Sequence, residues 1–219
     1  MNGGRIRRLT DVAMTLCLFF LMGFPFFGMT AHMAAGALFF LLLAFHHWLN
    51  RKWAPSLRRG RWNAVRKLQV GANAFLSLTI FGLLWSGLIL ARPAVGFIPY
   101  LGSMSLGREL HLVSAYWGFL AMSFHVGLHG DMFASMTRKA GAMTRRALSA
   151  ASSLLALYGV WALWSRDWLS HLFLQTEFVF FDFEESKVAY YLDHVAIMAL
   201  FVWLGWQAML WARRAQRKR

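Results

Sequence analysis

Long apolar segments alternate with short polar connections along the 219 residues of the chain. Six segments of 18 to 24 residues contain no Asp, Glu, Lys or Arg: Val12–Thr30, Ala31–Asn50, Leu68–Ala91, Leu110–Gly130, Ala147–Trp164 and His194–Ala212. A helix of about 20 apolar residues is long enough to cross the hydrocarbon core of a bilayer. The pattern therefore predicts an all-α membrane protein with six transmembrane helices. The first two helices are expected to meet at a tight turn near Gly28–Thr30, just after Pro25.

The composition favours the same class. Hydrophobic residues make up 58% of the chain, including 20 Phe and 11 Trp, and the mean hydropathy is +0.46. Too few polar residues remain to cover the surface of a soluble domain of this length. We therefore expect a single integral membrane domain over residues 1–219, without a soluble domain.

The net charge of +14 is distributed unevenly between the connections. If six helices alternate across the membrane, nineteen of the 23 Lys and Arg residues fall on the side of the two termini. The opposite side has most of the acids and four basic residues: Arg92, Arg108, Arg166 and Lys187. Basic connections mark the cytoplasmic side, so both termini are expected in the cytoplasm of a multi-pass protein of the bacterial inner membrane. Topology and contact with anionic membrane lipid account for the basic residues, and nucleic acid is not an expected partner.

The outer connections differ in character. The connection Pro93–Gly107 contains two prolines and three glycines and is expected to be irregular. The longest outer segment covers residues 165–193, and its part Trp168–Phe181 is apolar but interrupted by polar residues. This composition is typical of an interfacial helix or a re-entrant cap.

Two pairs of histidines share one spacing. His32 and His46, like His111 and His125, are 14 residues apart within a predicted membrane helix. Fourteen residues turn an α-helix through about 1,400°, close to four full turns, and rise about 21 Å. Each helix therefore presents two imidazoles on nearly one face, one near each side of the membrane.

The predicted topology pairs these histidines across two helices. The second and fourth helices run in the same direction, so His32 and His111, which open them, lie at the outer depth, and His46 and His125 at the inner depth. Two facing imidazoles at one depth are the axial ligand set of a b-type haem held in a helix bundle. We therefore expect two haem b groups, bound in a four-helix bundle formed by residues 1–132. Residues 147–212 then form an additional helix pair, with residues 165–193 as its outer cap.

The inner ligands have two alternates. His47 adjoins His46, and His129 follows His125 by four residues and lies on the same helical stripe. Equal spacing favours His46 and His125 as the ligands. His47 or His129 remains the alternative inner ligand, or either could bind a propionate or relay protons.

Other residues are candidates for contacts with haem or quinone. Arg92 and Arg108 on the outer side and Arg66 on the inner side could pair with propionates, although snorkelling at the membrane boundary explains them equally well. Glycines that would let a porphyrin approach a helix are Gly28, Gly36, Gly87 and Gly118 in the outer half, and Gly71 and Gly127 in the inner half. Asp193 and His194 could bind a quinone, although Asp193 could equally cap the last helix.

The chain resembles the di-haem membrane cytochromes b in its spaced histidines. More narrowly, it resembles the flavinylation-associated cytochromes, a family of small bacterial membrane proteins related to the ferric-reductase-like membrane domains. The resembling stretches are Gly28-Met-Thr-Ala-His32, Gly36, His46-His47-Trp-Leu-Asn50 with Trp53, His111 to His129, and Phe181-Asp-Phe-Glu184 through Asp193-His194. The resemblance implies electron transfer across the cytoplasmic membrane, often towards flavin-bearing proteins outside. The chain has no flavin-acceptor threonine motif and no Gly-rich nucleotide loop, so any flavin belongs to a partner.

The sequence thus predicts a di-haem electron-transfer subunit of an oxidoreductase. Its donor would be membrane quinol or a cytoplasmic reductase, and its acceptor an extracytoplasmic flavin- or haem-bearing redox protein. Two other functions stay open, namely a cofactor-free membrane anchor subunit and a His-lined proton or metal transporter. A metal transporter favours carboxylates or thiolates that converge mid-membrane, whereas Glu109 and Asp131 lie at the predicted helix ends.

Overall fold

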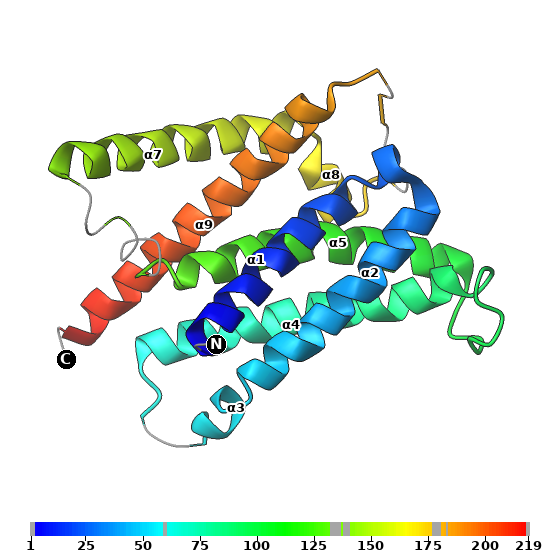
Figure 1. Ribbon diagram of the computed structural model, residues 1–219, viewed down its shortest axis with the longest axis horizontal. Helices are drawn as coiled ribbons and strands as arrows, with labels where there is room; N and C mark the ends of the chain where they lie inside the picture. Colours follow the sequence, from blue (N-terminus) through cyan, green and yellow to red (C-terminus); the bar gives the residue numbers. More distant parts are fainter. Residues whose placement is uncertain are drawn as a thin grey trace. The chain divides into compact units, whose positions relative to one another are not determined.

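The computed structural model describes residues 3–58, 61–131, 137, 141–176, 181–182 and 184–217 (Figure 1). The regular elements in these residues are all helices: α1 (Gly3–Met22), α2 (Phe24–Leu49), α3 (Trp53–Ser56), α4 (Ala64–Ala91), α5 (Met104–Leu128), α7 (Ala142–Ser165), α8 (Trp168–Leu172) and α9 (Lys187–Arg217). The predicted all-α class is therefore confirmed. Several residues of the predicted basic and outer connections lie outside the described residues: Arg59, Arg138, Lys139, Glu177, Lys218 and Arg219.

Four of the helices, α2, α4, α7 and α9, are long and apolar enough to cross a membrane. They coincide with four of the six predicted segments and support the membrane class. The other two predicted segments are occupied largely by α1 and α5, helices of 20 and 25 residues.

Several helices extend beyond the apolar segments that predicted them, because capping side chains set their first residues. The side chain of Asn63 accepts a hydrogen bond from the backbone of Arg66, and α4 begins at Ala64. The Ser103 hydroxyl accepts one from the backbone of Leu106, and α5 begins at Met104. Both contacts satisfy backbone N–H groups that have no partner within a helix. The prediction that His32 and His111 open their helices is consequently wrong, since α2 and α5 begin eight and seven residues earlier.

The connection between α1 and α2 begins earlier than predicted. α1 ends at Met22, and α2 follows after Gly23. The predicted position is right for a second bend, because Gly28 interrupts α2 with φ 75° and ψ 176°. Glycine adopts this positive φ without the steric cost that a side chain would add. The Tyr190 hydroxyl donates a 2.7 Å hydrogen bond to the Met22 carbonyl, one of the carbonyls that the end of α1 leaves without a helical partner.

The chain forms two compact units. The first unit comprises Met1–Trp62 and Phe181–Tyr191, and the second comprises Asn63–Phe180 and Leu192–Arg219. In the first unit, α1 and α2 lie side by side (Figure 1). The Cys17 thiol is buried in this unit and lies 3.3 Å from the carbonyl oxygen of Ala35 on α2.

In the second unit, α4 and α5 are packed closely through small residues (Figure 1). A Cβ on Gly82 would collide with the Ser114 side chain, and one on Gly107 would lie 2.7 Å from Cγ2 of Ile89. Gly127 of α5 and Gly205 of α9 also face each other at backbone distance. Small residues at such positions are the usual means by which membrane helices approach one another.

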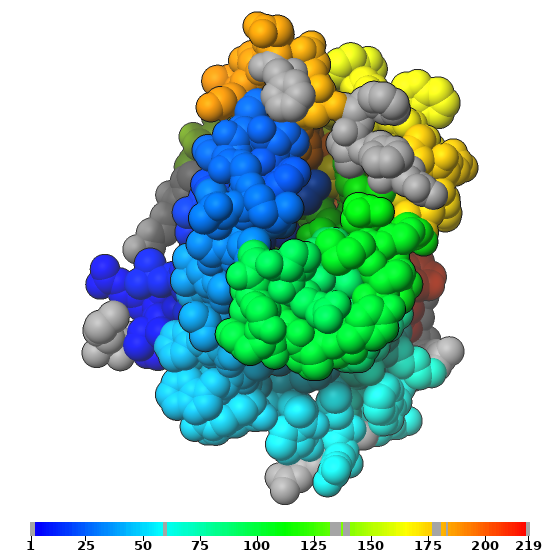
Figure 2. Space-filling view, turned by 90° about the vertical axis from the view of Figure 1, so that its right-hand side faces the viewer, coloured from blue at the N-terminus to red at the C-terminus, as the bar shows by residue number. Residues whose placement is uncertain are grey.

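The connection between α4 and α5 contrasts with the connection that follows α7. Of the connection predicted to be irregular, Pro93–Gly107, residues 93–103 form no helix, whereas residues 104–107 belong to α5. Figure 2 displays the part before α5, in green, as a rounded surface toward the viewer. In the other connection, α8 packs against α5 and α7. Trp168 is 1% exposed, and the Trp117 indole N–H donates a 2.9 Å hydrogen bond to the Leu172 carbonyl. The described part of the predicted cap is therefore held against α5.

Candidate functional site

His111 and His125 of α5 both form hydrogen bonds to side chains of α4. Nδ1 of His111 lies 3.1 Å from the Ser86 hydroxyl oxygen, and Nδ1 of His125 lies 2.8 Å from Oδ1 of Asn73. Both imidazoles are half-buried. The two histidines predicted to share a face of this helix therefore both contact the same neighbouring helix.

The hydrogen bonds define the tautomer of each imidazole. The Ser86 hydroxyl is fully buried, and its hydrogen is donated to the Gly82 carbonyl at 2.6 Å. Its oxygen can then only accept from His111, so Nδ1 carries the proton. The amide oxygen of Asn73 is also an acceptor, which puts the proton of His125 on Nδ1 as well. In both residues the lone pair of the ring is therefore on Nε2.

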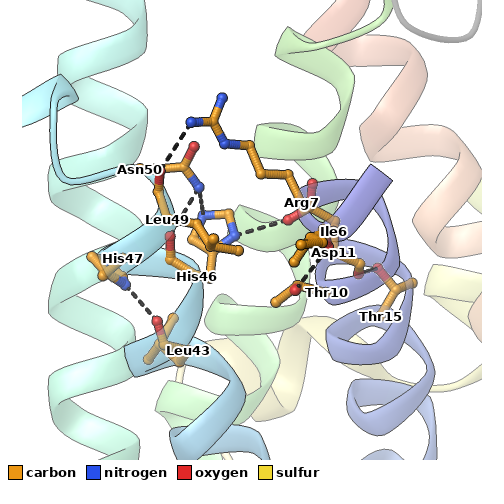
Figure 3. A network of polar contacts seen from close by, with 10 residues as sticks. All are labelled: Ile6, Arg7, Thr10, Asp11, Thr15, Leu43, His46, His47, Leu49 and Asn50. Atoms are coloured by element: carbon orange, nitrogen blue, oxygen red, sulfur yellow. Dashed lines mark hydrogen bonds and ion pairs between the residues drawn. The ribbon is translucent and has the colours of Figure 1, made fainter. Parts of the chain in front are cut away.

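His46 of α2 is held in the same way by an acid on α1. Nδ1 of His46 lies 2.8 Å from Oδ1 of Asp11, as Figure 3 shows. An ionised carboxylate only accepts hydrogen bonds, so Nδ1 carries a proton here too. A histidine that ligates a metal usually donates its other ring N–H to a carboxylate, a carbonyl or water, which orients the ring and raises its basicity. His46 and Asp11 have this arrangement.

The side chain of Asn50 lies next to the coordinating nitrogen of His46. Its Nδ2 is 3.5 Å from Nε2 of His46 and 2.9 Å from the His46 carbonyl oxygen (Figure 3). The first contact is at the limit of a hydrogen bond, and the second is of normal length. If His46 coordinates a metal through Nε2, the Asn50 amide must move away from Nε2. The 2.9 Å hydrogen bond from Asn50 to the His46 carbonyl can be kept.

His32 lies at the other end of α2, beside the last turn of α1. It forms a hydrogen bond to the backbone of Leu21, and its ring meets that of Phe24 edge-on at 5.2 Å between centroids. His32 and His46 therefore both contact α1, as the predicted common face requires. Because α2 belongs to the first unit and α5 to the second, the pairing of His32 with His111 and of His46 with His125 stays a prediction.

The alternate ligands have different surroundings. His47 is exposed, and its Nδ1 donates to the carbonyl of Leu43 in the preceding turn of the same helix at 2.9 Å. His129 is the exposed C-cap of α5, and its ring lies 5.0 Å from that of His125. His46 and His125 are each oriented by a neighbouring helix, which favours them over His47 and His129.

The arginines proposed to hold propionates lie at helix ends. Arg92 follows the last residue of α4 and packs over the ring of Tyr100 at 5.5 Å. Arg108 is exposed in the second turn of α5, and the backbone of Arg66 is bound by the Asn63 cap. These positions are compatible with propionate contacts and with the membrane boundary alike.

Asp193 and His194 lie inside α9, since this helix begins at Lys187, so Asp193 is not its N-cap. Asp193 is 6% exposed, accepts a 2.6 Å hydrogen bond from the Tyr158 hydroxyl and pairs with Arg166 at 2.7 Å. His194 is 3% exposed and packs on Trp168, at 5.7 Å between ring centroids. Asp193 thus joins α7 to α9, and a role in quinone binding stays a prediction.

Sequence reasoning missed the residues that orient the histidines: Asp11, Asn73 and Ser86. One of them has a visible signal, because Asp11 is the only acid in the first 108 residues. An acid at the edge of an apolar segment, at the end where His46 is expected, could have been recognised as its partner.

Within the described part of the chain, no three side chains of His, Cys, Asp or Glu are grouped so that they could hold one metal ion. Single imidazoles that contact another side chain through Nδ1 are compatible with axial haem ligation, which stays a prediction. Four of the glycines proposed to give a porphyrin clearance have no atom within 4 Å of an added Cβ, namely Gly28, Gly36, Gly71 and Gly87. Gly118 packs against α4 and Gly127 packs against α9, so neither leaves open space beside its helix.

Comparison with known proteins returned no matching family model, no matching curated protein and no matching solved structure.

Proposed function

We propose that this protein is a di-haem b-type cytochrome that transfers electrons between the two faces of the bacterial cytoplasmic membrane. In this proposal all six long helices cross the membrane and both termini lie in the cytoplasm. His32 and His111 hold the outer haem, and His46 and His125 hold the inner one.

The observation that supports the proposal is that three of these four histidines contact a side chain of the adjacent helix through Nδ1. His46, His111 and His125 each donate their Nδ1 proton to a side chain of the adjacent helix. With the proton on Nδ1 the lone pair lies on Nε2, the nitrogen through which each of these residues would ligate an iron. The repeated arrangement at a 14-residue spacing supports ligation over a purely structural role.

The protein's part in this function is to hold two redox centres at different depths. A bound haem supplies a reversible one-electron change at its iron. The rise of about 21 Å between the histidines of each helix keeps the two sites apart. Apolar side chains of the long helices exclude water and ions from the path between them.

The redox partners follow from this placement. Electrons would come from membrane quinol or a cytoplasmic donor and pass to an extracytoplasmic flavin- or haem-bearing protein. Asp193 and His194 are the residues we propose for quinone contact. The protein would then serve as the membrane subunit of an oxidoreductase.

The test is a reduced-minus-oxidised spectrum of the purified protein combined with a haem-to-protein ratio. We expect a b-type α band and two haems per chain, with one haem lost in His46→Ala and one in His111→Ala. His47→Ala is the matched control, since the exposed His47 binds only its own helix among the contacts described for it, and it should keep both haems. A purified protein without a b-type band after expression with sufficient haem would contradict the proposal and favour an anchor subunit without a cofactor.

A further inference from the structure

We propose that Asp11 is a positioning residue that lowers the midpoint potential of the haem ligated by His46. Its carboxylate fixes the His46 imidazole with Nε2 available to the iron, and its negative charge stabilises the oxidised iron. This inference rests on the proposed function and adds a determinant of the redox potential to it.

The geometry of the contact is that of a charge-assisted hydrogen bond. Asp11 lies on α1 and His46 on α2, within the same compact unit, and their Oδ1 and Nδ1 atoms are 2.8 Å apart (Figure 3). The length is typical of a bond between an N–H donor and an ionised acceptor. Such a bond aligns the ring more strongly than a neutral partner would.

The carboxylate is directed at the imidazole and not at a neighbouring arginine. Arg7 lies one turn before Asp11 on α1, but its guanidinium donates to the carbonyl of Leu49 at 3.1 Å. Within the residues that the structure describes, the Asp11 carboxylate contacts the His46 ring at 2.8 Å. The carboxylate therefore lies directly beside this imidazole.

The partners described above for the other proposed ligands are neutral. His111 bonds the Ser86 hydroxyl, and His125 bonds the Asn73 amide. Replacing a neutral acceptor at Nδ1 with a carboxylate increases the basicity of the ring and its donation through Nε2. Ferric iron carries one more positive charge than ferrous iron, so a stronger donor and a nearby anion both favour the oxidised state. The effect is moderated by solvent, because the side chains of His46 and Asp11 are 27% and 44% exposed.

Asp11→Asn is the decisive variant, because it removes the charge and retains an oxygen acceptor of the same size. In a spectroelectrochemical titration of the full-length protein, each haem takes up one electron from the electrode mediator. We expect one of the two components to move to higher potential and the other to stay. A change of about tenfold in the relative stability of the oxidised form corresponds to about 59 mV for a one-electron couple.

Asn73→Asp is the reciprocal variant. It places a carboxylate on Nδ1 of His125 and should lower the potential of the haem that His125 ligates. If His46 and His125 share the inner haem, both substitutions move the same component, and the double variant returns it toward the wild-type value. Asp131→Asn serves as the charge control, since Asp131 pairs with Arg213 and should leave both potentials unchanged.

The possible outcomes separate this inference from the proposed function. A wild-type protein without haem overturns the proposed function. A wild-type protein with two haems, whose Asp11→Asn variant keeps both at unchanged potentials, overturns the role of Asp11 alone. If the Asp11→Asn variant loses one haem, its potential cannot be measured, and the potential of that haem is measured in Asp11→Glu instead. Retention of that haem at the wild-type potential supports the inference, and loss of the haem or an upward shift overturns it.

Discussion

The hydroxyl of Ser86 is fully buried on α4 and accepts a hydrogen bond from Nδ1 of His111 on α5. Because the same hydroxyl donates to the Gly82 carbonyl, its direction is fixed, and with it the orientation of the imidazole. The candidate ligand is thus oriented by a residue 25 positions away in the sequence. What distinguishes His111 from an ordinary interhelical histidine is therefore a property of α4 as much as of α5.

Removing this hydroxyl should weaken haem binding without abolishing it. Ser86→Ala deletes a methyl-sized polar group and leaves the ligand itself intact. Loss of a residue that orients a metal ligand typically lowers affinity about 10- to 100-fold. We expect the variant to lose one haem at a lower concentration of competing apo-myoglobin than the wild type does, while His111→Ala lacks that haem at the outset.

Ser77→Ala is the control, because the exposed Ser77 binds only the carbonyl of Asn73 in its own helix among the contacts described for it. Equal haem retention in Ser86→Ala and wild type would contradict the proposed role of Ser86.

Breaking the buried ion pair of Asp193 should destabilise the junction of α7 and α9. Asp193→Ala leaves the Arg166 guanidinium, whose side chain is 20% exposed, without its carboxylate. Removal of one partner from a buried pair typically costs about 3–5 kcal/mol. We expect a clearly lower midpoint of thermal unfolding in detergent, measured by circular dichroism.

The exposed pair of Asp131 and Arg213 is the matched comparison for Asp193. The side chain of Asp131 is 65% exposed, and exposed pairs contribute only about 0–1 kcal/mol. Asp131→Ala should therefore unfold close to the wild type. If Asp193→Ala and Asp131→Ala lower the unfolding midpoint equally, burial of the Asp193 pair does not determine its contribution to stability.

The helices could be predicted from the sequence, whereas the contacts that orient the histidines could not. Uninterrupted apolar segments identify α4 and α9 because a bilayer imposes a minimum length, but their first residues depend on caps such as Asn63. The histidine spacing follows from helix geometry alone and needs no tertiary information. The pairing of His125 with Asn73 depends on how α4 and α5 are rotated and shifted against each other. That arrangement is determined by packing, and no local sequence pattern specifies it.

Close packing of α4 against α5 should make Gly107 intolerant of a side chain. A Cβ at this position would lie 2.7 Å from Cγ2 of Ile89, which is itself 2% exposed and has little room to move. Overpacking of this kind typically costs about 1–3 kcal/mol. We expect Gly107→Val to lower the unfolding midpoint, and Ile89→Ala to restore part of the loss in the double variant.

A matched substitution at a glycine with open surroundings should have the opposite sign. Gly71 lies within α4, and nothing lies within 4 Å of an added Cβ. Replacing a helical glycine with alanine without a clash removes a conformational cost of roughly 0.5–1 kcal/mol. Gly71→Ala should unfold at the wild-type temperature or above it, unless this glycine provides space for a haem. In that case the variant would lose haem while the stability of the apoprotein is retained.

Helix α8 should detach from its packed position as the pH falls, because His171 is buried there. This residue is 5% exposed, its ring lies 4.6 Å from that of Tyr116, and burial lowers its pKa below the ordinary 6.5 although Asp167 opposes the shift. Below pH 6.5 an opened α8 therefore binds a proton that the packed α8 does not. The stability of the packed state is constant above this value and decreases as the pH drops from 6.5 toward the folded-state pKa.

Thiol labelling can measure this opening. Leu172 is 5% exposed, so a Leu172→Cys thiol in a Cys17→Ser background is protected while α8 is packed. We expect its labelling rate, normalised to that of the denatured protein at each pH, to increase between about pH 7.5 and about pH 5.5, as the linkage relation requires. The same measurement on a His171→Gln variant should give a normalised rate that no longer depends on pH. An unchanged wild-type rate across this range would mean that His171 is protonated without opening α8.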